Sequence, residues 1–136
     1  DSANSQTYQQ NLARFCRSNE LLDDSLHRAL KPLRHRSFII HHPALGYLAR
    51  RYGLRQIAVE HDGKEPSAAR IRQIISRARA EGVTTVFISK EHTGRAARQI
   101  AEAIGARVVE INPLDYDVPR QLRLITDALT QTAAPR

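Results

Sequence analysis

Histidine and carboxylate side chains recur directly after the short apolar segments of this chain. Each of four segments is followed by such a group: His41 and His42 after the first, Glu60, His61 and Asp62 after the second, Ser89, Glu91 and His92 after the third, and Asn112 and Asp115 after the fourth. Imidazole and carboxylate are the ligands that zinc and other divalent transition metals take in proteins. The spacing is compatible with a metal site, but ordinary polar loop residues, which any α/β protein carries at its strand ends, explain it better on spacing alone.

Other kinds of functional site lack their sequence signatures. The chain contains no HExxH, CxxC or GxxxxGK[ST] motif, and no GxGxxG follows the first apolar segment. Cys16 stands beside Phe15 in a helical pattern, which predicts a small buried side chain rather than a nucleophile. Because no nucleophile and base stand at a recognisable spacing, the sequence predicts a binding protein and not an enzyme.

The composition is that of one ordinary globular domain with a basic surface. The 136 residues are 41% hydrophobic and 26% charged, and 21 basic against 14 acidic side chains give a net charge of +7. This charge supports an alternative function, a basic α/β module that binds an anion or nucleic acid. However, no aromatic residues interleave with the arginines of the segment 70–79, so we expect a solvated face and no nucleic-acid partner. The chain has no Met and begins with Asp1, which predicts a processed protein or a fragment.

From residue 37 onward, the sequence alternates four times between strand and helix patterns. Strands are predicted at 37–41, 56–60, 83–89 and 106–111, and helices at 44–52, 66–80, 93–104 and 119–130. Apolar strands that alternate with helices indicate a four-stranded parallel sheet with helices on both faces, for which we predict the order 2-1-3-4. Ligands of such folds bind outside the carboxyl ends of the strands, where the histidines are expected.

The first part of the chain reads as one long helix over residues 6–31. Its apolar positions form a single stripe, and Pro32 would end it: Tyr8, Leu12, Phe15, Leu22, Leu26, Ala29 and Leu33. At ~1.5 Å per residue, such a helix spans ~39 Å and would overhang the domain. We therefore expect residues 1–36 to be a linker helix and residues 37–136 an α/β lobe. The overhanging part of the stripe predicts a homodimer formed through Tyr8, Leu12 and Phe15.

One stretch of the chain is similar to a known family. Residues 38–54, FIIHHPALGYLARRYGL, resemble the His-x-Ala-x-Gly-Tyr…Tyr-Gly-Leu segment of the metal-binding subunits of bacterial ABC importers for zinc and manganese. The Glu65-Pro66-Ser67 and Ile111-Asn112-Pro113-Leu114 motifs follow in the family's order. This resemblance implies a receptor of two α/β lobes joined by a long helix, with the metal bound between them. The chain would then be the C-terminal lobe with the interlobe helix.

The resemblance also implies ligands, cargo and partners. His42 corresponds to the family's histidine ligand and favours zinc, with manganese or iron as alternatives. The family's second ligand in this lobe is an Asp, where this chain has Asn112, so His41, His61, Glu60 or Asp115 could replace it. The implied partners are a missing N-terminal lobe and an ABC permease, and the implied location is the periplasm or the outer face of the cell membrane.

The position of His42 before Pro43 leaves two roles open for it. A residue before proline is disfavoured in the α region, which would hold His42 extended at the corner between strand and helix. A rigid corner suits a metal ligand, but the same position also suits a cap of the helix that follows. If the strand geometry continues, the adjacent His41 would point to the opposite face.

Overall fold

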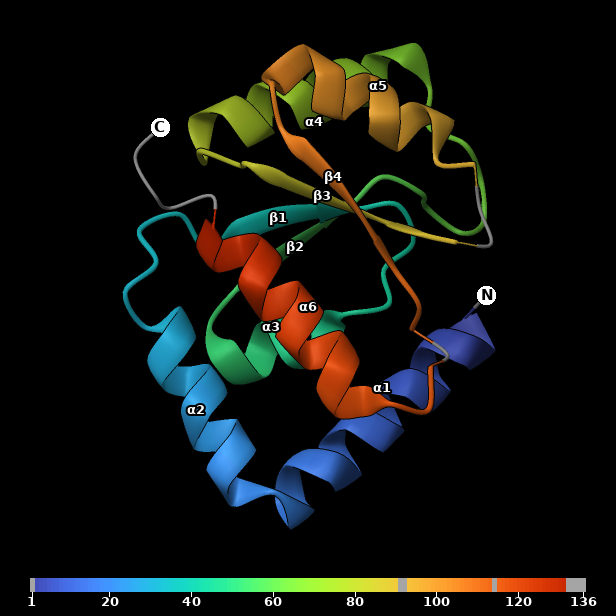
Figure 1. Cartoon of the computed structure of the whole chain (residues 1–136). Helices are drawn as coiled ribbons and strands as arrows, with labels where there is room; N and C mark the ends of the chain where they lie inside the picture. The colour runs from blue at the N-terminus through green and yellow to red at the C-terminus, as the bar shows by residue number, and fades with distance from the viewer. Residues whose placement is uncertain (1, 91–92, 114, 132–136) are drawn as a thin grey trace.

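The computed structural model describes residues 2–90, 93–113 and 115–131 and shows six helices and four strands among them (Figure 1). Their bounds are α1 Ser2–Ser18, α2 Glu20–Leu30, β1 Ser37–Ile40, α3 Gly46–Tyr52, β2 Arg55–Ala58, α4 Ala68–Ala80, β3 Thr85–Ser89, α5 Arg95–Ile104, β4 Arg107–Ile111 and α6 Val118–Gln131. Every strand and helix predicted after residue 36 is present, with bounds shifted by at most two residues. None of the described helices is both long and apolar enough to cross a lipid bilayer.

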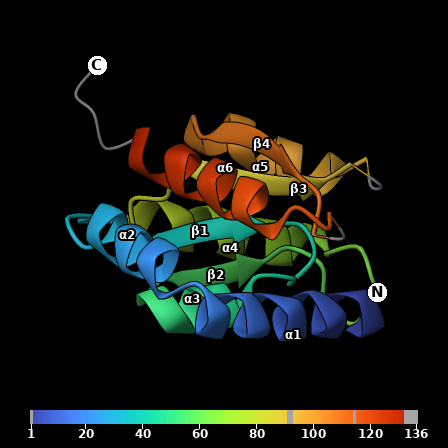
Figure 2. The same ribbon diagram turned by 60° about the horizontal axis from the view of Figure 1, so that its bottom comes forward.

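The four strands form one sheet in the order β2-β1-β3-β4, and all neighbours are parallel, as predicted. Helices α4 and α5 cover one face of the sheet, and α1, α2, α3 and α6 cover the other (Figure 2). Since all the strands run the same way, the loops that follow them meet at one edge of the sheet. This is the edge at which the histidines were predicted.

Two apolar cores hold the layers together, one on each face of the sheet. Alternate residues of β1 enter different cores: Phe38 and Ile40 pack with α1, α2, α3 and α6, whereas Ile39 packs with α4 and α5. All four residues of β1 are buried, as expected for a central parallel strand. The alternation of side chains fixes the register of β1 and therefore the place where His41 and His42 leave the sheet.

The predicted single helix over residues 6–31 is wrong, because the chain bends at Asn19. This residue has φ −132° and ψ 68°, outside the helical region, and its carbonyl accepts the first hydrogen bond of α2 from Asp23 N–H at 3.1 Å. Just before the bend, the Ser18 hydroxyl donates to the carbonyls of Arg14 and Phe15, a pattern that often accompanies bent helices. Helices α1 and α2 therefore form a V (Figure 1).

The bend also removes the basis for the predicted homodimer. Tyr8 and Leu12 are 2% and 0% exposed and lie in the same core as Leu26 and Leu30 of α2. Phe15 is half-buried against that core. A straight helix could not pack the apolar residues of both halves against one lobe. In the V, the apolar residues of both α1 and α2 pack into the core of this chain.

A charged cluster fixes α2 against α3. The Asp23 carboxylate accepts two hydrogen bonds from the Arg51 guanidinium, at 2.8 and 2.6 Å, and one from the Tyr52 hydroxyl at 2.7 Å. The bidentate bond from Arg51, followed by the bond from Tyr52, lowers the pKa of Asp23. Cys16 is buried beside Tyr52, as predicted for a packing residue, and burial raises the pKa of its thiol.

The depressed pKa of Asp23 predicts a loss of stability in acid. Its contribution is complete above the unfolded-state pKa of 3.8 and disappears as the pH falls through the lower folded-state pKa. We expect Asp23→Asn to lower the free energy of unfolding by about 2 kcal/mol at pH 7, and by much less near pH 2. Urea unfolding across this pH range measures the difference. The exposed neighbour Asp24 is the control, and an equal loss for Asp23→Asn at both pH values would contradict the assignment.

Candidate metal site

The structure brings His41, His42 and Glu60 together beyond the ends of β1 and β2. The Glu60 Oε1 atom lies 3.4 Å from His42 Nδ1, and Glu60 Oε2 lies 3.5 Å from His41 Nε2. The opposite orientation expected for the two histidines depended on continued strand geometry, whereas both rings here lie within 3.5 Å of the same carboxylate. Strand geometry ends at Ile40, so the alternation of side chains does not extend to His41 and His42.

The backbone on both sides of this cluster is fixed by hydrogen bonds. The pairing of β1 with β2 continues past the strands, because Val59 N–H donates to Ile40 O at 2.9 Å and Glu60 N–H to His41 O at 2.8 Å. After the proline, Ala44 N–H donates to His42 O at 2.7 Å, which closes a three-residue turn. Helix α3 begins only at Gly46 with Leu45 as its N-cap, so His42 is not the cap of this helix.

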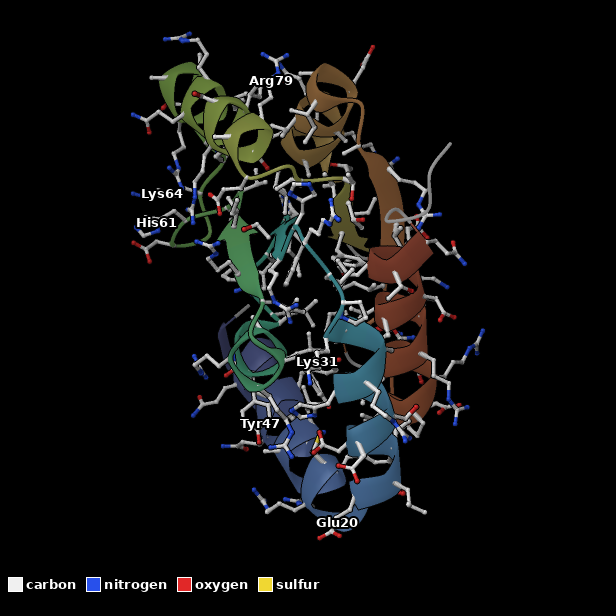
Figure 3. All side chains as sticks on the ribbon, turned by 90° about the vertical axis from the view of Figure 1, so that its left-hand side faces the viewer. Glu20, Lys31, Tyr47, His61, Lys64 and Arg79 are labelled. Carbon is white, nitrogen blue, oxygen red and sulfur yellow. The ribbon has the colours of Figure 1, made fainter. Side chains whose placement is uncertain are left out.

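The other candidates after β2 lie away from the cluster. The His61 side chain is 91% exposed and its Nε2 lies 3.3 Å from Asp62 Oδ2, whose side chain is 80% exposed. Figure 3 shows His61 and Lys64 at the margin of the molecule. Asp62 and Gly63 both have positive φ and form the tight turn that carries His61 outward. Glu91 and His92 lie outside the described residues.

Asn112 and Asp115 follow β4 and are joined through a side chain that sequence reasoning did not single out. Gln121 of α6 is buried, its Oε1 accepts from Asn112 N–H at 3.0 Å, and its Nε2 donates to Asp115 Oδ2 at 3.1 Å. Asp115 Oδ1 also accepts from Asp117 N–H. The one signal in the sequence was a polar residue on the apolar face of α6. Gln121 thus holds the loop that displays Asn112.

The described residues do not by themselves form a complete metal site. Among residues 2–90, 93–113 and 115–131, no three His, Cys, Asp or Glu side chains are grouped so as to hold a metal ion. His42 is close to the surface, with its side chain 18% exposed, whereas the His41 side chain is 6% exposed. Of the two imidazoles, His42 is the one that an ion arriving at this edge could reach.

The arginines of α4 form a solvated face, as predicted. Arg70, Arg72, Arg77 and Arg79 are all exposed. Two of them bond within the chain: Arg77 Nε lies 2.6 Å from Glu81 Oε2, and Arg79 donates to Ala103 O. The pKa of Glu81 is lowered, first by a hydrogen bond from the Ser37 hydroxyl and then by the one from Arg77. Two of the four arginines of α4 are therefore engaged in interactions within the chain.

A family model described as "Zinc-uptake complex component A periplasmic" matches residues 1–131 of the chain. The chain belongs to this family. Among curated relatives, the "High-affinity zinc uptake system protein ZnuA" of Bacillus subtilis is 28% identical over 117 residues, which cover 85% of this chain and 37% of the relative. The "Zinc-binding protein AdcA" of Streptococcus pyogenes is 25% identical over 127 residues, or 92% of this chain and 25% of the relative.

Solved structures of the same family share the fold. A "Crystal structure of ZnuA" has a TM-score of 0.80 and 36% identity, and the match covers 96% of this chain and 51% of that one. A ZnuA deletion mutant described as "plus zinc bound" has a TM-score of 0.78 and 34% identity, with 100% and 52% covered. This chain of the zinc-uptake family therefore spans about half the length of these structures.

Proposed function

We propose that this chain is the C-terminal half of a zinc receptor of a bacterial ABC importer. In this proposal residues 37–136 form one lobe, and residues 1–36 lead to it from a second lobe outside this chain. Zinc is the cargo and binds between the lobes. The observation that carries the proposal is the match of residues 1–131 to a zinc-uptake family, since the family model covers nearly all of the chain.

His42 is the residue of this lobe that we assign to the metal. A neutral imidazole is a preferred ligand of zinc, and this one lies at the sheet edge where ligands of open α/β folds bind. The turn closed by Ala44 N–H holds the backbone of His42, so little freedom is lost when a metal binds. Zinc sites use three or four protein ligands, and we assign the remaining ones chiefly to the second lobe.

Asn112 is the second candidate ligand in this lobe. Its amide oxygen is neutral, which disfavours manganese because that metal prefers hard, charged oxygen donors. The bond from its own N–H to the buried Gln121 fixes its backbone at the edge. We therefore favour zinc over manganese and iron, with His42 as the principal ligand and Asn112 as a weak one.

The receptor role implies a location and a partner. The family description includes the word periplasmic, and a relative in Streptococcus pneumoniae is named a "Zinc-binding lipoprotein". We propose that the protein acts outside the cytoplasmic membrane, in the periplasm or at the outer face, and delivers zinc to a membrane permease. The role requires binding and release of the ion and no catalysed reaction.

The proposal predicts weak zinc binding by this chain alone. With most ligands on the second lobe, we expect a dissociation constant in the micromolar range or weaker, and affinity at least ~1,000-fold tighter for the two-lobed protein. Competition calorimetry with a zinc chelator measures both. Nanomolar affinity of the isolated chain would contradict the half-site and point to a complete site that includes His41, His42, His61 and His92.

A further inference from the structure

Glu60 is the feature of this edge that zinc binding by His42 alone does not explain. Its carboxylate lies between two imidazoles, with Oε1 3.4 Å from His42 Nδ1 and Oε2 3.5 Å from His41 Nε2. The Glu60 side chain is 13% exposed, although a free carboxylate would be better solvated in water. A half-buried carboxylate with one oxygen near each of two imidazole rings indicates a specific task for it.

The main chain holds Glu60 in this position independently of its side chain. Its N–H donates to His41 O at 2.8 Å, one residue beyond the last pair of β1 and β2. On the other side of the carboxylate, His41 N–H donates to Phe87 O of β3 at 3.0 Å, which anchors His41 in the sheet. The main chain at Glu60 and His41 is therefore linked by hydrogen bonds to the central strands of the sheet.

The ring nitrogen of His42 that lies near Glu60 indicates which nitrogen is available to a metal. An imidazole that binds a metal through one nitrogen usually presents its other N–H to a carboxylate, which fixes the tautomer and the ring orientation and makes the ligand more basic. Glu60 Oε1 lies 3.4 Å from Nδ1 of His42, which is longer than an ordinary N–H···O hydrogen bond, and the other ring nitrogen, Nε2, is left for the metal. The second oxygen of Glu60, Oε2, lies 3.5 Å from Nε2 of the buried His41.

We propose that Glu60 is a positioning residue that holds His42 for zinc, and that His41 in turn holds Glu60. This inference rests on the proposed function. It gives the two adjacent histidines different roles: His42 binds the ion, whereas His41 supports the carboxylate behind it. It also accounts for a half-buried acid at this edge without making it a ligand.

The test is a zinc titration of Glu60 variants in the two-lobed protein. Glu60→Gln keeps the shape but removes the charge, and we expect zinc affinity to fall ~10- to 100-fold, with little change in the thermal midpoint of the metal-free protein. Asp62→Asn removes an exposed carboxylate two residues away and is the matched control, with unchanged affinity expected. Unchanged affinity of Glu60→Gln would overturn the inference.

A double variant separates positioning from direct ligation. If Glu60 acts through His42, then His42→Ala with Glu60→Gln binds zinc no more weakly than His42→Ala alone. A further loss in the double variant would make Glu60 a ligand itself and overturn the positioning role. Unchanged affinity of His42→Ala would instead overturn the proposed function of this edge, and the inference with it.

A readout without metal keeps the inference testable if a variant folds poorly. Nitrogen NMR of the metal-free protein reports which ring nitrogen of His42 carries the proton. We expect the Nδ1–H form in the unaltered protein and a shift away from it in Glu60→Leu, which lacks an acceptor. The same tautomer in both proteins would contradict the inference, whereas a merely structural role of Glu60 predicts no shift.

Discussion

Replacing Arg36 with alanine is expected to lower the free energy of unfolding by about 3 kcal/mol, because hydrogen bonds to charged groups contribute ~1.5–3 kcal/mol each and are not additive. Arg36 lies between α2 and β1, and its guanidinium donates to carbonyls at the ends of two helices. The acceptors lie at or just after the ends of α2 and α3: Leu30 O, Lys31 O and Leu33 O for α2, and Tyr52 O and Gly53 O for α3. Without Arg36, these carbonyls lose a shared donor.

The expected loss of stability in Arg36→Ala follows from the unpaired carbonyls at the C-terminal ends of helices. The last carbonyls of a helix have no partner within it, and a cation near them also interacts favourably with the helix dipole. The two shortest bonds, to Tyr52 O at 2.7 Å and Gly53 O at 2.8 Å, hold the end of α3 against the segment that leads into β1. Arg36 therefore joins α2, α3 and β1, and its loss affects all three elements.

Chemical unfolding of Arg36→Ala and Arg55→Ala provides the comparison. Arg55 is a matched control, since its side chain is 69% exposed and its ion pair with Glu81 is 3.9 Å long. We expect Arg55→Ala to change the free energy of unfolding by less than about 0.5 kcal/mol. Equal effects of the two substitutions would contradict the assignment of Arg36 as a shared cap.

The sheet could be predicted from the sequence because its determinants are local. Strand segments such as 37–40 and 85–88 alternate with helical segments along the chain. Few sheet topologies are compatible with this alternation, and most of them are parallel. The bend at Asn19 could not be found in the same way. The apolar stripe continues through it by the seven-residue step from Phe15 to Leu22, and only packing onto one lobe distinguishes a V from a straight helix.

The candidate site could be predicted in part. The sequence identified the sheet edge, and it singled out His42 through its resemblance to a family segment. It did not predict that His41 and His42 share one carboxylate, because this depends on where β1 ends and on its pairing with β2. The role of Gln121 depends in the same way on how α6 packs, which a single polar residue on a helix does not reveal.

Replacing His42 with alanine is expected to lower the zinc affinity of the two-lobed protein by at least ~100-fold, because a site of three or four ligands loses one of them. The stability of the metal-free protein should change little, since the side chain lies near the surface and is not the cap of α3. An effect on stability comparable to that of Arg36→Ala would indicate a structural role instead.

Zinc titration of His42→Ala beside His61→Ala, both in the two-lobed protein, is the most direct test. His61 is a matched histidine at the same sheet edge, but its side chain is 91% exposed and its Nε2 lies 3.3 Å from the exposed Asp62. We predict that His61→Ala binds zinc as tightly as the unaltered protein and that His42→Ala loses at least ~100-fold. Equal affinities for His42→Ala and the unaltered protein would contradict the assignment of this edge as half of a zinc site.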